Sequence, residues 1–209
     1  MIFLMNIKRL QQQMTRVKVA IVSGCLLIAG SPVMAQTLPV KRQAPNYMDL
    51  LRMTADSVLR LPVEKNAREY YFRVTRTIYS EALVITKTEA AHQNGTVNAA
   101  FVQTMLQLIT KLRNDLKPPR VNQPTLPVST FIQRNTDAAL GNFRRYQQPV
   151  GLDRERQYLW VMNQVFENLN QINIGYLQAG LTPEEKKHVW QRLQVQQQIA
   201  SQLRSKYEP

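Results

Sequence analysis

Few residues of this chain have types and spacing that could do chemistry, and two of them lie one helical turn apart. Glu185 and His188 have the Glu-x-x-His spacing of carboxylate-bridged di-iron bundles. Such a site needs two of these motifs and inward-facing glutamates on two further helices. Glu185 also follows Thr182 by three residues, which predicts a helix-capping role at a solvated helix start. We therefore expect neither a metal site nor a cofactor here.

Catalysis by other side chains has little support in the sequence. His92 is expected near the end of a helix, where an imidazole interacts favourably with the helix dipole. There is no Gly-x-Ser-x-Gly elbow for a serine nucleophile. A carboxylate pair that hydrolyses cell-wall or glycan substrates stays open, with Glu81 and Glu167 as the mid-helix glutamates near apolar stripes. We expect a protein that is not an enzyme and bears no small-molecule site, and we keep a carboxylate hydrolase as an alternative.

A binding role is better supported, because basic residues are concentrated in the middle of the chain. Residues 111–156 contain nine basic and four acidic residues, and Phe143 and Tyr146 bracket two adjacent arginines. Such a surface suits an acidic protein or an envelope polyanion. Nucleic acid is not the expected partner, because the first 35 residues have the order of a secretory signal and an exported protein seldom meets nucleic acid. The candidate basic binding surface consists of Lys117, Arg120, Arg134, Arg144 and Arg145.

The C-terminal third carries more large aromatic residues than two helices packed on each other can bury. These residues either pack on the rest of the protein or form an exposed stripe that docks a partner helix or a second copy of the chain. The candidate docking stripe consists of Trp160, Phe166 and Trp190.

Helices must position these groups, because apolar residues recur in steps of three and four along most of the chain. A helix is expected over 64–91, with Lys65, Arg68, Arg73 and Arg76 on its solvent side. A strand over 70–79 is the alternative, because that run is rich in aromatic and β-branched residues. Further helices are expected over 46–61, where Asn46 is the N-cap, over 96–117 from Thr96, and over 129–148 from Ser129.

Residues 152–207 give the clearest pattern, a helical hairpin. One apolar seam repeats every seven residues from Tyr158 to Ala179, and another runs from Val189 to Tyr207. Gly180 stands where a helix C-cap glycine belongs, and Thr182 begins a capping box with proline at the first helical position. Because so short a connection forces neighbouring helices antiparallel, the two must pack side by side.

These elements predict an all-α protein, a bundle of about six helices that ends in a long antiparallel hairpin. Helices over 36–117 are followed by a proline-rich connector over 118–127, and further helices fill 128–209. The four prolines of the connector exclude a helix there. Whether the connector links two lobes or crosses one bundle is left open by the pattern.

The first 35 residues have the order of a secretory signal peptide. Four basic residues and no acid precede or flank an apolar run over 19–30, and small residues follow up to Ala35. Met14 is a possible start that gives a more compact signal. The run is too short to span a bilayer as a helix. Val22 to Cys25 resembles the lipobox of bacterial lipoproteins, but the apolar run continues past Cys25, so lipidation is the less favoured alternative and an uncleaved anchor another.

Cleavage after Ala35 leaves 23 basic and 14 acidic residues, a net charge of +9, and no cysteine. We therefore expect a periplasmic or secreted protein that acts as a structural or adaptor component of the bacterial envelope, for example within a secretion or conjugation apparatus. This expectation rests on an analogy of size and composition. Its partners would be other envelope proteins or further copies of itself, and a binder of anionic surfaces is the alternative.

Mass spectrometry of the exported protein tests the cleavage site. We expect a mature N-terminus at Gln36, because the basic, apolar and small segments precede it in that order. A diacylated peptide that starts at Cys25 would instead establish the lipoprotein alternative.

Overall fold

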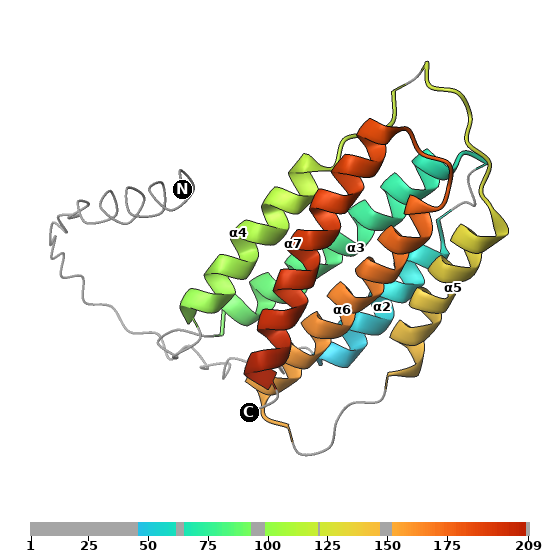
Figure 1. The fold of residues 1–209 in the computed structure, drawn as a ribbon. Helices are drawn as coiled ribbons and strands as arrows, with labels where there is room; N and C mark the ends of the chain where they lie inside the picture. The colour runs from blue at the N-terminus through green and yellow to red at the C-terminus, as the bar shows by residue number, and fades with distance from the viewer. Residues whose placement is uncertain (1–45, 62–64, 93–98, 121, 147–151, 208–209) are drawn as a thin grey trace, which may run out of the picture. The chain divides into compact units, whose positions relative to one another are not determined.

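The computed structural model describes residues 46–61, 65–92, 99–120, 122–146 and 152–207, apart from the side chains of Thr130, Phe131 and Arg144. All regular elements in these ranges are helices, so the predicted all-α bundle is confirmed and the strand alternative over 70–79 is wrong (Figure 1). The helices are α2 (Tyr47–Leu59), α3 (Ala67–Ala90), α4 (Ala99–Asp115), α5 (Thr130–Arg145), α6 (Arg154–Leu177) and α7 (Pro183–Tyr207). The expected signal segment and Thr96 lie outside the described residues.

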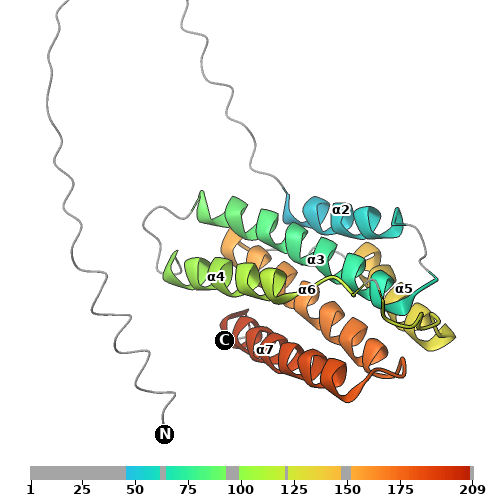
Figure 2. The ribbon, with the colours of Figure 1, turned by 90° about the horizontal axis from the view of Figure 1, so that it is seen from above.

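The six helices form two layers of three. Helix α3 lies between α2 and α4 in one layer, and α6 lies between α5 and α7 in the other (Figure 2). The layers meet where α3 packs on α6 and where α2 packs on α5. The two central helices are therefore covered on several sides, which explains why each of them buries thirteen residues of its 24.

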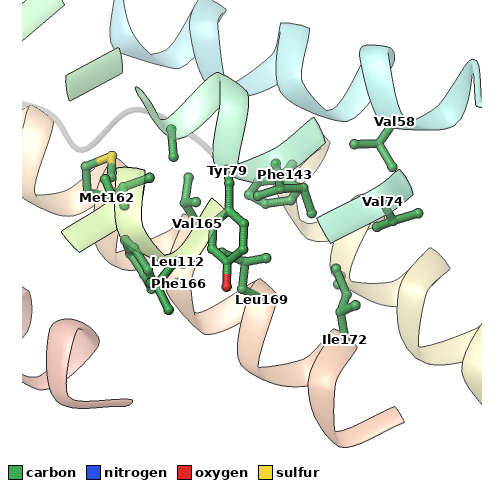
Figure 3. Close-up of a cluster of buried hydrophobic side chains, with 14 of the residues drawn as sticks. Val58, Val74, Tyr79, Leu112, Phe143, Met162, Val165, Phe166, Leu169 and Ile172 are labelled. Atoms are coloured by element: carbon green, nitrogen blue, oxygen red, sulfur yellow. The ribbon is translucent and has the colours of Figure 1, made fainter. Parts of the chain in front are cut away.

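The core lies between the layers and draws side chains from all six helices. Tyr79 of α3, Phe143 of α5 and Phe166 of α6 are fully buried there (Figure 3). Helices from both sides of the connector thus share one core, so residues 118–127 cross a single bundle. Burial of a large apolar side chain contributes about 1.5–3 kcal/mol, so this shared core is the main source of stability.

Side-chain caps fix where several helices begin. Asn46, Ser129 and Asp153 each accept a hydrogen bond from a backbone N–H in the first turn of the following helix. Asn66 does the same for α3, so this helix begins at Ala67 and later than predicted. Asn66 also pairs with Pro127 of the connector in an isolated antiparallel bridge. The connector is thereby tied to the start of α3.

The hairpin of α6 and α7 has the predicted antiparallel arrangement. Arg204 pairs with Glu167, and Asn173 donates a hydrogen bond to Gln196, so the register of the two helices is set at two levels. The turn contains Gly180 with a φ of 77°, a left-handed conformation that costs a side-chain-bearing residue about 1 kcal/mol or more.

Substitution Gly180→Ala should therefore lower the free energy of unfolding by about 1 kcal/mol. The added Cβ would meet only Leu126 at 3.8 Å, an ordinary contact, so the backbone alone would carry the cost. Urea denaturation of the two proteins measures the change. The control is Gly141→Ala within α5, where a Cβ meets nothing within 4 Å and helix propensity should raise stability. A Gly180→Ala variant as stable as the parent would contradict the account of the turn.

Candidate functional site

An ion pair between buried Arg68 and half-buried Glu185 joins the start of α3 to the start of α7. Arg68 donates from Nε to Glu185 at 2.5 Å and from a terminal nitrogen to the second carboxylate oxygen at 3.1 Å. Its remaining terminal nitrogen donates to the carbonyl of Pro124 at 2.7 Å. Arg68 is only 7 % exposed, so its predicted place on the solvent side of α3 is wrong. This clamp, formed by Arg68, Glu185 and Pro124, holds two helices and the connector together.

Glu185 has a second role in the clamp. Its carboxylate accepts hydrogen bonds from the backbone N–H and the hydroxyl of Thr182, whose hydroxyl in turn accepts from the Glu185 N–H. The predicted capping box is therefore confirmed. The hydrogen bonds from Arg68, supported by those from Thr182, lower the pKa of the Glu185 carboxyl from 4.5 to about 2. Glu185 thus stays ionised at neutral pH, and both of its carboxylate oxygens are engaged by Arg68 and Thr182.

Basic side chains lie at the same end of the bundle as the clamp, where α2 and α4 end and α3, α5 and α7 begin (Figure 1). Seven of these side chains are exposed, and none of the seven has an ion-pair partner among the described residues. Exposed acidic side chains at these helix ends are fewer: Asp56, Glu69, Asp115, Asp137 and Glu184. We call this surface the basic end; it consists of Arg60, Lys65, Lys117, Arg120, Arg134, Lys186 and Lys187.

The basic end contains only part of the predicted basic surface. Lys117, Arg120 and Arg134 belong to it, but Arg145 lies at the other end of α5. Eleven residues separate Arg134 from Arg145, about 16 Å along the helix axis. Arg145 is exposed, whereas the side chain of its neighbour Arg144 is outside the described part. The structure therefore places Arg145 apart from Lys117, Arg120 and Arg134, because α5 separates its first turns from its last.

The predicted docking stripe is also divided by the structure. Phe166 has no exposed surface, so it belongs to the core and cannot dock a partner. Trp160 is half-buried and packs edge-on against Tyr146, with ring centroids 5.3 Å apart. Trp190 alone of the three predicted residues is exposed, at 53 %.

A polar network that the sequence did not reveal crosses the interior between α3, α6 and α7. Asn173 accepts from the Tyr71 hydroxyl and donates to Gln196, which donates in turn to the hydroxyl of Tyr79. Arg192 donates to the Tyr71 hydroxyl at 2.6 Å. Burial raises the pKa of both tyrosines, so both hydroxyls stay protonated, and that of Tyr71 donates to Asn173. These amides and phenols satisfy one another, as buried polar groups must.

A second cluster joins α2, α3 and α6 at the opposite end of the bundle. Buried Glu89 accepts from the Tyr47 hydroxyl and from Nε of Arg154, and Arg154 also donates to Tyr47 at 3.0 Å. Glu89 and His92 repeat the Glu-x-x-His spacing of Glu185 and His188. The two motifs lie about 30 Å apart, since Glu89 is 21 residues along α3 from Arg68, which contacts Glu185. They therefore cannot share a pair of metal ions.

The other candidate chemical groups lie apart from one another. Glu167 is at the surface in an ion pair with Arg204, and Glu81 lies on α3. His188 is 3.8 Å from Glu184, and His92 contacts the Thr88 carbonyl at 2.7 Å. In the ranges with described coordinates, no three histidine, cysteine or carboxylate side chains are grouped as metal ligands, and no helix is long and apolar enough to cross a bilayer.

Comparisons with known proteins add no relative: no family model, no curated protein and no solved structure matches this chain.

Substitution Glu185→Gln should lower the free energy of unfolding by about 3 kcal/mol, because it leaves the buried Arg68 guanidinium without its counter-charge. The pKa of Glu185 is lower in the folded than in the unfolded chain, so the ion pair stabilises the fold above about pH 4.5. The difference between parent and variant should then shrink as the pH falls from 4.5 towards 2. Denaturant titrations across this pH range measure both effects.

Glu184→Gln is the matched control, because Glu184 is the adjacent residue and its side chain is 74 % exposed. We expect its effect to stay within about 0.5 kcal/mol at every pH. Equal effects of the two substitutions would show that the clamp does not stabilise the bundle.

Proposed function

We propose that this protein is an exported, non-enzymatic adaptor of the bacterial envelope that binds an acidic protein partner through the basic end. A component of a secretion or conjugation apparatus is the kind of role that suits it. The observation that carries the proposal is the set of exposed cations without ion-pair partners that lie around the Arg68–Glu185 clamp at one end of the bundle.

The interior supports a scaffold role. Buried charged and amide side chains contact one another across helices, as in the clamp, the Tyr71–Asn173–Gln196–Tyr79 network and the Tyr47–Glu89–Arg154 cluster. Groups engaged in this way fix the relative positions of helices. The side chains available for recognition are therefore those of the surface.

The surface supports an acidic partner. The seven cations of the basic end come from five separate segments of the chain, so their placement depends on the folded bundle. An exposed cation that has no internal counter-charge loses no ion pair when a partner carboxylate approaches. Complementary charges of this kind accelerate association and select the partner.

The order of segments in residues 1–35 supports export. These residues lie outside the described ranges, and the first described helix, α2, begins after them at Tyr47. A bundle that begins beyond the signal is compatible with removal of the signal.

Charge reversal at the basic end tests the proposal. The variant Lys65→Glu, Lys117→Glu, Lys187→Glu changes three exposed side chains that come from three segments. We expect its recovery of envelope partners in cross-linked pull-downs to fall at least about tenfold, because like charges would then face the acidic partner. Binding by the parent should also weaken steeply as the salt concentration rises.

The matched control reverses three exposed cations at the opposite end: Lys87→Glu, Arg145→Glu, Arg156→Glu. Its change in net charge is the same, so a nonspecific effect of charge would appear in both variants. Undiminished partner recovery by the first variant, or an equal loss in the control, would refute the assignment of binding to the basic end.

A further inference from the structure

Helix α7 carries a second heptad row, one residue after the row that it buries. The buried row includes Val189, Leu193, Gln196, Ala200 and Leu203. The next residue in each case gives a row with the same steps of four and three, and such a row follows one side of a helix. This outer row consists of Trp190, Gln194, Gln197, Ser201 and Arg204.

All five residues of the outer row are exposed, although the row has the spacing of a helix-packing seam. Trp190 stands at one end with 53 % of its surface exposed, which is unusual for so large an apolar side chain. Between the ends lies a shallow, open depression lined by Gln194, Gln197, Gln198 and Ser201.

The outer row is self-complementary about its centre. Trp190 precedes Gln197 by seven residues, and Arg204 follows it by seven. An antiparallel copy of α7 centred on Gln197 therefore brings each tryptophan opposite the arginine of the other copy. Arginine over a tryptophan face is a favourable pair, and two glutamine amides can donate to and accept from each other.

We propose that two copies of this chain associate through their α7 helices, antiparallel about a twofold axis at Gln197. Trp190 of each copy then lies against Arg204 of the other copy. Such an isologous contact closes on itself and yields a dimer.

Charge favours a second copy as the occupant. Like-charged copies repel one another at the basic end, whereas the outer row has one charged residue, and Arg204 is already paired with Glu167. The segment 157–209 is also nearly balanced, with five basic and four acidic residues. An acidic partner would find little to bind in this row, but an identical row offers a matching tryptophan, arginine and amides.

The dimer does not depend on the proposed function, because it uses a different surface and a different partner. The two also differ in their response to salt. Binding at the basic end should weaken steeply with salt, whereas the dimer dissociation constant should change less than about threefold between 50 and 500 mM salt.

The sequence after Ala35 has no cysteine, so one introduced cysteine reports contacts between copies. Gln197→Cys in residues 36–209, which include all the described helices, should give covalent dimers with a short bismaleimide. The control is Gln107→Cys, an exposed glutamine of α4, which should stay monomeric. Equal cross-linking of both variants, or none at Gln197→Cys, would overturn the proposal.

Sedimentation velocity measures the dimer without a cross-link. Trp190→Ala should raise the dimer dissociation constant about 30-fold, the effect of losing a central aromatic contact. Thermal unfolding should stay close to that of the parent, because Trp190 lies outside the core. A parent protein that remains monomeric at about 200 μM, or an unchanged constant in Trp190→Ala, would refute the twofold contact.

Discussion

The Arg68–Glu185 ion pair is the interaction on which the arrangement of the surface depends. Arg68 is almost fully buried, so its charge must be balanced by a partner that reaches in from α7. Its third contact, to Pro124, holds the connector against the same point. Because α3, α7 and the connector meet here, the cations beside them share one surface. Without the pair, a buried guanidinium would oppose packing of the hairpin on α3.

The helices and several of their first residues could be predicted from the sequence. Steps of three and four identify each helix, and the caps at Asn46, Ser129 and Thr182 follow from residue type. Helix ends were less accurate, since α3 begins at Ala67 and α5 ends at Arg145.

Burial on the central helices could not be predicted from one stripe. A hairpin of two helices would bury only one side of α6, but α3, α5 and α7 cover it on several sides. Phe166 and the polar Asn173 are therefore buried, although neither stands on the predicted seam. The predicted exposure of Arg68 was wrong for the same reason, because its ion-pair partner is 117 residues away in the chain. Periodicity reports one face of one helix, whereas these contacts depend on how helices assemble.

Two surfaces of α7 serve different parts of the proposed role. The start of α7 contributes Lys186 and Lys187 to the basic end, while its outer row carries Trp190 and continues to Arg204. One helix can therefore offer one surface to an acidic partner and a separate surface to a second copy of the chain. The shared core suits this arrangement, because it packs the helices that carry the two surfaces against one another.

Zero-length carbodiimide cross-linking in the intact envelope tests the central claim most directly, since it joins lysine amines to carboxylates that touch them. The account predicts partner carboxylates linked to Lys65, Lys117, Lys186 and Lys187 of the basic end. Lys87 and Lys206 lie at the opposite end and serve as internal controls. Partner carboxylates linked mainly to Lys87 and Lys206 would contradict the account.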